Sequence, residues 1–152
     1  MLLETSDFKK EHETVVKWLG ISKVTLRRAN PAFSYISIIK NGIRSKSVNS
    51  FIKHSGLSKK QVSRIIHISE RSLQRYPPDK IIDSPSSERL IDLSRLFYQG
   101  IKVFNEKEKF ITWLNRPNRA LDNQLPLELV ETNMGINLVF DELLKIEHGV
   151  FS

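Results

Sequence analysis

Residues 57–76, which read LSKKQVSRIIHISERSLQRY, combine apolar residues at helical spacing with signals that start and end two short helices. The first helix begins after Ser58, because Gln61 lies three residues further on and the two have the spacing of a capping box. Its inner face consists of Val62, Ile65 and Ile66. Only His67 and Ile68 separate this helix from the next one.

The second helix of this stretch begins after Ser69, which can accept a hydrogen bond from a free backbone amide. Leu73 is its inward-facing residue. The helix ends before Pro77-Pro78, because proline lacks the amide donor and its ring clashes with the preceding turn. The pattern therefore predicts a helix-turn-helix.

A helix-turn-helix lays its second helix in the major groove of DNA, with the residues near the N-terminus of that helix against base edges. The candidate DNA-binding residues are Ser58, Lys59, Lys60, Arg64, Ser69, Glu70, Arg71, Ser72, Gln74 and Arg75. Their charged, amide and hydroxyl groups bond to bases or to phosphates. A small helical domain with a solvated charged face gives the same pattern, and this alternative stays open on the pattern alone.

The chain before this motif also has helical patterns. A helix is expected over residues 6–19, with Ser6 as its cap and Gly20 as a left-handed stop. Residues 21–29 are basic and ambiguous.

A second helix over residues 32–40 follows Asn30-Pro31, a cap with proline at the first helical position. Residues 33–38 also alternate as a strand would, and helix is the preferred interpretation. A third helix starts at Ser45 or Ser47 and is closed by Gly56.

The longest predicted helix covers residues 85–104, with Ser84 as its cap and Pro85 in its first turn. Its main apolar face contains Leu90, Leu93, Phe97, Ile101 and Phe104. The next helix starts at Asn105, and Glu108 completes a capping-box spacing. These faces indicate helices that are buried in a core or in a dimer interface.

The last predicted elements are a short helical turn that Pro126 begins and a final helix that Thr132 caps and His148-Gly149 ends. The predicted fold is therefore all-α. Turn-rich residues divide it into a helical DNA-binding domain over residues 1–80 and a small helical domain over residues 81–152, for which dimerisation is one of the two alternatives.

The charge of the chain is divided in the same way. Residues 1–80 hold 16 Lys and Arg against 6 Asp and Glu, a balance of +10, and residues 81–152 hold 8 against 11, a balance of −3. Basic residues near phosphates release condensed counterions, which gives a salt-dependent affinity for DNA. The basic half is also the half with the helix-turn-helix, so charge favours the DNA-binding interpretation.

Composition excludes several classes of protein. The chain has no cysteine, which rules out disulfides and thiolate metal sites. No apolar run approaches the roughly 18 residues of a membrane span, and the N-terminus lacks a signal-peptide core, so a cytoplasmic protein is expected. The six glycines are scattered, the four histidines have no HExxH spacing and no GxSxG motif is present. An enzyme, a metal and a cofactor are therefore not expected.

The sequence from Leu90 onward resembles the toxin-binding domain of the Xre/MbcA/ParS antitoxin family. The matching marks, in order, are Val103-Phe104, Trp113-Leu114, Arg116-Pro117-Asn118, Ala120-Leu121, Pro126-Leu127, Leu129, Thr132, Gly135 and the closing run IEHGVF from Ile146 to Phe151. The helix-turn-helix resembles the same family, with Ser72 where threonine is expected. The family's glycine-containing turn reads Asp122-Asn123-Gln124 here, and asparagine tolerates the left-handed conformation.

The resemblance implies an antitoxin of a type II toxin–antitoxin system. Its expected partners are a RES-domain toxin that degrades NAD, the operator DNA of its own operon, a second copy of the chain in a homodimer, and the toxin in a hetero-oligomer. The candidate toxin-binding residues are Arg116, Asn118, Arg119, Leu121, Glu147, His148, Gly149, Val150 and Phe151.

A physical hypothesis for neutralisation follows from the acidic C-terminal half. A pocket that cleaves an anionic dinucleotide is expected to be basic, so Glu147 and Phe151 could cover its mouth while Arg116 and Arg119 hold the flanking loop. In the alternative, Arg116 and His148 bond to the backbone of their own domain. A second alternative for the whole chain is a helix-turn-helix transcriptional regulator whose C-terminal half dimerises or senses a ligand.

Overall fold

The computed structural model describes residues 5–22 and 32–149, and within these ranges the chain is built from helices and turns without a β-strand. The elements in chain order are α1 (Thr5–Trp18), α2 (Ala32–Asn41), α3 (Ser45–Ser55), α4 (Lys59–Ile66), α5 (Glu70–Arg75), α6 (Ser84–Phe104), α7 (Lys107–Leu114), the 3₁₀ turn η1 (Arg119–Leu121), α8 (Pro126–Leu129) and α9 (Asn133–Glu147). The predicted all-α fold is confirmed. In this part of the chain no helix has the length and apolar character needed to cross a membrane.

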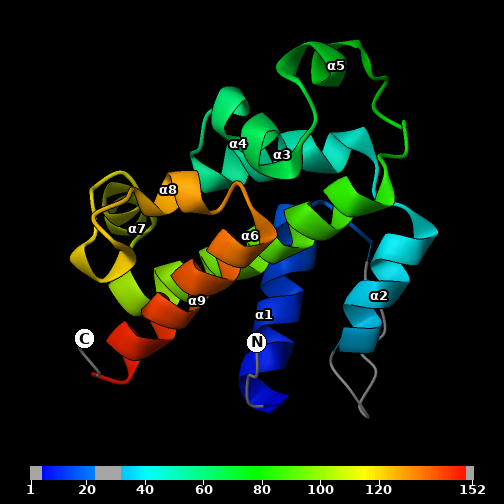
Figure 1. The fold of residues 1–152 in the computed structure, drawn as a ribbon. Coiled ribbons are helices and arrows are strands. Elements are labelled where there is room, and N and C mark those ends of the chain that lie inside the picture. The colour runs from blue at the N-terminus through cyan, green and yellow to red at the C-terminus, as the bar shows by residue number, and fades with distance from the viewer. Residues whose placement is uncertain (1–4, 23–31, 150–152) are drawn as a thin grey trace.

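Helix α6 lies at the centre of the fold, and helices from both halves of the chain pack around it (Figure 1). Leu90, Leu93 and Leu96 are fully buried along it. The Phe97 ring makes edge contacts with Phe51 of α3 and with Phe110 of α7, at centroid distances of 5.6 and 5.0 Å. One hydrophobic core thus joins the helix-turn-helix to the C-terminal helices, and burying each such aromatic side chain contributes about 1.5–3 kcal/mol.

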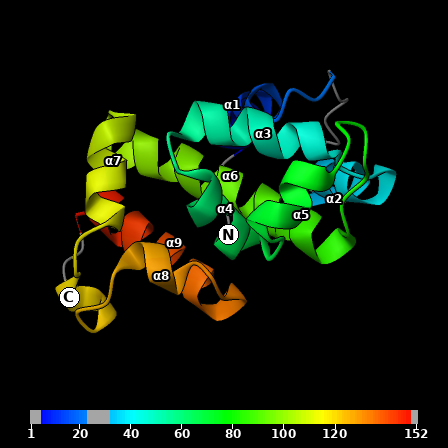
Figure 2. The same ribbon diagram turned by 90° about the horizontal axis from the view of Figure 1, so that it is seen from above.

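The absence of a side chain at Gly100 lets α7 approach α6 closely. A Cβ atom at this position would lie 2.3 Å from Cζ of Phe110. The Phe110 ring therefore occupies the space that any larger residue would take. Seen from above in Figure 2, α7 crosses one end of α6, and α3 and α4 pack along it, whereas Figure 1 shows α5 standing further away from α6.

The helix-turn-helix prediction is confirmed in its boundaries, its caps and its inward-facing residues. Ser58 and Gln61 form the capping box, and Ser69 caps α5. Gly20 and Gly56 have the left-handed conformation that was predicted for helix stops, with φ of +62° and +80°.

The region that could have been a strand is helical. Ser34, Tyr35 and Ile38 of α2 are buried, a spacing that fits one face of a helix. Packing against α1, through Tyr35, and against α6 decided between the two patterns. The predicted start at Asn30-Pro31 lies outside the described residues, as do residues 23–29 of the ambiguous segment.

The predicted helix caps Ser6 and Ser84 are wrong. Ser6 lies inside α1 rather than before it. Asp83, not Ser84, caps α6, and its carboxylate accepts from the amide of Ser86 at 2.8 Å. A carboxylate at this position accepts the amide hydrogen bond and also interacts favourably with the helix dipole.

The predicted capping box at Asn105 is also wrong. Asn105 closes α6 in the left-handed conformation, with φ of +67°, and α7 begins two residues later at Lys107. Asparagine serves at either end of a helix, and here the end of α6 takes it.

The hydrophobic core continues across the predicted domain boundary between residues 80 and 81. Backbone bonds from Ile82 N to Ile43 O (2.9 Å) and from Ser45 N to Lys80 O (2.8 Å) tie the connecting segment to the start of α3. The division of roles between residues 1–80 and 81–152 stays a prediction.

Candidate functional site: a DNA-reading helix pair and a C-terminal protein-binding face

Local hydrogen bonds build the candidate DNA-reading helix pair. The Ser58 side chain accepts from the Gln61 amide at 3.1 Å, and the Gln61 side chain accepts from the Ser58 amide at 2.9 Å. The Ser69 side chain accepts from the Ser72 amide at 3.1 Å. Between the helices His67 has a left-handed backbone, with φ of +63°, which turns the chain sharply enough to separate the axes of α4 and α5.

These caps leave the charged residues free to reach outward. We call the exposed polar side chains of the two helices the recognition surface; they are Lys60, Arg64, Glu70, Arg71, Gln74 and Arg75. Lys59 is half-buried. Ser58 and Ser69 are occupied as caps, and the hydroxyl of Ser69 donates to that of Ser72 at 3.0 Å. The structure therefore places the predicted cations on one exposed helix pair, whereas the predicted serines hold its shape.

The second group of candidate residues begins in the loop after α7. The Asn118 side chain accepts from the Ala120 amide at 2.8 Å, and the Asn118 amide donates to Gln124 O at 3.0 Å, which closes the loop. Asp122 and Asn123 both have a left-handed backbone, with φ of +56° and +58°, so the loop turns without the family's glycine. Arg116 and Arg119 are exposed.

Leu121 faces the core and is only 8% exposed, so it supports this loop from inside. Beside the loop lies an open groove of about 530 Å³, lined by Phe104, Trp113, Arg116 and Asn118 among others. Its walls are apolar rings, and charged side chains of both signs, Glu108, Lys109 and Arg116, also line it, a combination suited to a protein segment that carries apolar and charged groups.

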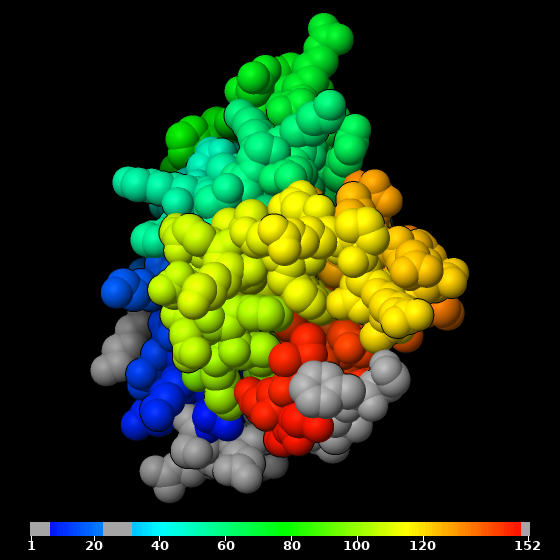
Figure 3. All heavy atoms as spheres, turned by 90° about the vertical axis from the view of Figure 1, so that its left-hand side faces the viewer, coloured from blue at the N-terminus to red at the C-terminus, as the bar shows by residue number. Residues whose placement is uncertain are grey.

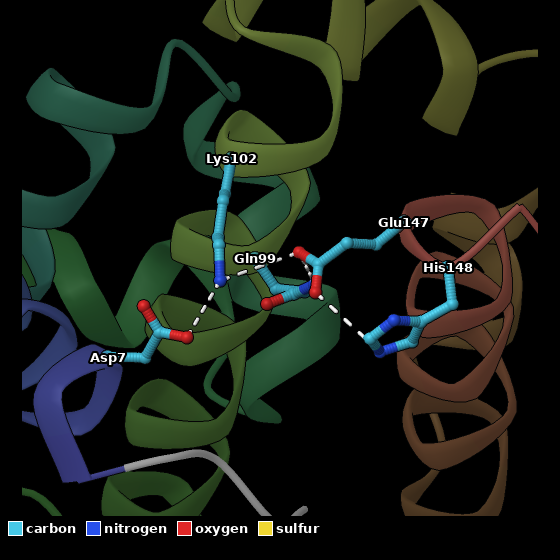
Figure 4. A network of polar contacts seen from close by, with 5 residues as sticks. All are labelled: Asp7, Gln99, Lys102, Glu147 and His148. Carbon is cyan, nitrogen blue, oxygen red and sulfur yellow. Dashed lines mark hydrogen bonds and ion pairs between the residues drawn. The ribbon is translucent and has the colours of Figure 1, made fainter.

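The end of α9 holds the remaining candidates. Glu147 accepts a hydrogen bond from Gln99 Nε2 at 2.9 Å and lies 3.5 Å from Lys102 Nζ, which in turn pairs with Asp7 at 3.0 Å. Figure 4 shows these side chains joining α1, α6 and α9. The His148 side chain is 67% exposed and lies 3.8 Å from Glu147, which makes Glu147 an anchor for the last turn of α9.

The contacts of Lys102 also change its acidity. Burial lowers the pKa of Lys102, but the hydrogen bond to Asp7 and the charge of Glu147 outweigh burial, so its pKa is raised. The ammonium group therefore remains charged and holds the acidic residues of α1 and α9 together. Gly149 is the last described residue, with φ of +71°, and Val150 and Phe151 lie outside the described residues.

Sequence reasoning missed two exposed apolar residues of α9. Met134 is 78% exposed and Leu138, one turn further on, is 50% exposed. They lie on the opposite side of the helix from the buried Ile136, Val139 and Phe140. The signal was present in the sequence as a second apolar pair at a spacing of four residues.

We call the exposed surface formed by the loop over residues 115–125, the groove beside α7 and the end of α9 the C-terminal face. Figure 3 shows these segments gathered on one side of the molecule. Helix α5 lies well away from it in both Figure 1 and Figure 2. In the described residues no three His, Cys, Asp or Glu side chains gather as they would around a metal ion. Exposed charged side chains in both regions, and the apolar groove in the second, are typical of binding surfaces.

Comparison with known proteins matches both regions. Residues 34–95 match the Antitoxin Xre-like helix-turn-helix domain, and residues 99–149 match the Antitoxin Xre/MbcA/ParS C-terminal toxin-binding domain. The two matches meet within α6.

Two curated relatives and one solved structure extend the comparison. An "Antitoxin Xre" of Yersinia enterocolitica is 31% identical over 119 residues, which is 77% of this chain and 80% of the relative. A "Prs ADP-ribosylating antitoxin" of Sphingobium sp. is 24% identical over 137 residues, which is 84% of this chain and 86% of the relative. A chain in the crystal structure of the M. tuberculosis MbcT–MbcA toxin–antitoxin complex shares the fold, with a TM-score of 0.54 and 24% identity, over 71% of this chain and 96% of that one.

Proposed function

This chain belongs to the Xre/MbcA/ParS antitoxin family, and from that premise we propose that it neutralises a RES-domain, NAD-consuming toxin by direct binding and represses its own operon through DNA. Membership in this family by itself makes the chain an antitoxin of a toxin–antitoxin system with a helix-turn-helix domain. One relative is named "Prs ADP-ribosylating antitoxin", and because ADP-ribosylation consumes NAD, this name supports a toxin partner whose chemistry involves NAD.

The observation that carries the proposal is the separation of the two binding surfaces on one core. The recognition surface on α4 and α5 is exposed away from the C-terminal face, so DNA and toxin can be bound by one molecule at the same time. Met134 and Leu138, exposed in the first half of α9, add an uncovered apolar pair of the kind found in interaction sites.

For the DNA half, we assign base contacts to Arg71, Gln74 and Arg75 and phosphate contacts to Lys60 and Arg64. The first three lie on α5, the helix that enters the groove in proteins of this type, and the last two lie on α4, which crosses the backbone. A homodimer would present two such helices to half-sites about 34 Å apart.

For the toxin half, we assign anchoring and plugging to different residues. Glu147 is already bound to Gln99 and Lys102, so it fixes the last turn of α9. The residues after it, from His148 to Phe151, then cover the mouth of the toxin's dinucleotide pocket. Arg116 and Arg119 hold the toxin beside that pocket, and Met134 and Leu138 add apolar contact. The chain acts by binding rather than by catalysis, and it acts in the bacterial cytoplasm.

The test is cellular NAD and growth after induction of the neighbouring open reading frame, alone and with this chain. A loss of NAD that co-expression reverses, together with a co-purified complex, supports the proposal. A chain that lacks residues 149–152 should then fail to neutralise although it melts at the wild-type temperature. The absence of a toxic neighbour and of any complex overturns the toxin half and leaves a DNA-binding regulator.

Three variants test the DNA half, two at proposed base contacts and one at a proposed phosphate contact. Arg71→Ala or Arg75→Ala is expected to weaken operator binding by about 1–3 kcal/mol and to relax sequence preference, because each removes a base contact. Lys60→Ala should weaken binding to all sequences alike. It should also reduce the slope of the logarithm of the binding constant against the logarithm of salt concentration by about one. Equal effects on specific and random DNA from all three variants would contradict the base-reading assignment.

A further inference from the structure

Arg89 is a buried cation that joins the two matched regions. It lies on α6 and is only 4% exposed. Its Nε atom donates to Ile65 O at 2.5 Å, Nη1 donates to Asn133 Oδ1 at 2.6 Å, and Nη2 donates to Val130 O. One side chain thus bonds to the last turn of α4, to the C-cap residue of α8 and to the first residue of α9.

The ends of two helices explain why a charge is buried there. Ile65 lies in the last turn of α4 and Val130 is the C-cap of α8, and both positions carry carbonyl oxygens without a partner inside their helices. The negative ends of two helix dipoles therefore converge on the guanidinium. Because its planar donors match these acceptors, Arg89 supplies what a lysine at this position could not.

His67 makes a second connection between the same two regions. Its Nε2–H donates to Glu131 O at 2.8 Å. His67 is the left-handed residue that sets the angle between α4 and α5. Residues 130–133 are therefore attached both to the end of α4 and to the turn that orients the recognition helix.

The same four residues also set the start of α9. Thr132 caps this helix by accepting from the Gly135 amide at 2.9 Å, and Leu129 O lies too close to Gly135 for any side chain there. Residues 130–133 are therefore packed so closely against the start of α9 that a displacement there would strain them, since close-packed interiors transmit strain.

We propose that residues 130–133 are a coupling link, which positions the recognition helix through Arg89 and His67 and makes operator binding and toxin binding depend on each other. This inference rests on the proposed function and adds a means of regulation to it. By linkage, whatever factor the toxin imposes on DNA affinity, DNA imposes on toxin affinity.

The decisive variant is His67→Asn. Asparagine keeps a residue that tolerates the left-handed backbone, but its shorter side chain cannot reach Glu131 O. His54→Asn is the control, because His54 is an exposed histidine of α3. In the wild type and in the control, a duplex from the DNA upstream of the chain's own gene should slow hydrogen exchange at the amides of Gly135 and Ile136, far from the DNA. In His67→Asn that slowing should be lost.

The second arm measures DNA affinity with and without the co-purified toxin. The wild type and the control should show a change of about fivefold or more, in either direction, and the factor for His67→Asn should fall toward one. If DNA and toxin both bind but neither arm distinguishes His67→Asn from the control, the coupling link is refuted and the proposed function stands. If the chain binds no DNA, the coupling link and the DNA half of the proposed function are both refuted.

Discussion

The substitution Gly135→Ala measures how closely α8 and α9 are packed where the toxin-binding region begins. A Cβ atom at residue 135 would lie 1.8 Å from Leu129 O and 2.8 Å from Thr132 Oγ1. Ordinary contact starts at 3.4 Å, so the first of these distances has to grow by about 1.6 Å, the difference between 3.4 and 1.8 Å. The start of α9 must therefore move away from α8.

The expected destabilisation is the balance of three effects. Overpacking costs about 1–3 kcal/mol, and loss of the Thr132 cap costs about 1 kcal/mol more. Alanine has a helix propensity about 1 kcal/mol better than glycine, which offsets part of this. The net loss is about 1–3 kcal/mol, or a fall in melting temperature of about 2–12 °C for a chain of this length.

Urea and thermal unfolding followed by circular dichroism provide the assay. Asn137→Ala, at an exposed position of the same helix, is the control and should be neutral or slightly stabilising. Folded Gly135→Ala should also bind the toxin more weakly than the control does. If Gly135→Ala is as stable as the wild type, the glycine is not required for the close approach of α8 and α9, and the reasoning fails.

Three more predictions concern stability and binding. Arg89→Met should lower the free energy of unfolding by about 2–4 kcal/mol in urea titrations, because three acceptors lose a charged donor. Methionine carries no charge that must be desolvated on folding, and this offsets only part of the loss. Burial lowers the pKa of His12 below 6.5, against the opposing charge of Glu13, so the unfolded chain binds its proton more readily. Stability should therefore fall as pH decreases below about 6.5, and His12→Phe should show a smaller loss between about pH 7.5 and about pH 5.5 in the same titration. Leu138→Asp should leave the melting temperature unchanged and weaken toxin binding by about 1–3 kcal/mol in calorimetry, whereas an unchanged affinity would remove this residue from the interface.

Neighbouring residues determine much of the helix-turn-helix, which is why the sequence predicts it. Ser58, Gln61 and Ser69 form their hydrogen bonds within three residues of chain, and Pro77 blocks the helix wherever it stands. The exposure of Arg71 and Arg75 follows from the same periodicity, since Leu73 must face the core.

Where two local solutions have similar energies, tertiary packing decided between them. Residues 33–38 fit a strand or a helix by pattern, and the burial of Tyr35 and Ile38 selected the helix. Asn105 and Glu108 have a capping-box spacing, but the end of α6 used Asn105 in the left-handed conformation instead. Such choices depend on which neighbour each residue meets.

The sequence by itself thus determined the all-α class, the helix-turn-helix and, through family resemblance, the toxin-binding region. Only the tertiary structure brought Arg89 to the ends of α4 and α8 and left Met134 and Leu138 uncovered. The physical reason is range: caps and helix periodicity act over three or four residues of chain. The groups that bond to Arg89 lie 24 to 44 residues away in the sequence. The exposure of Met134 and Leu138 depends on which other helices pack against α9.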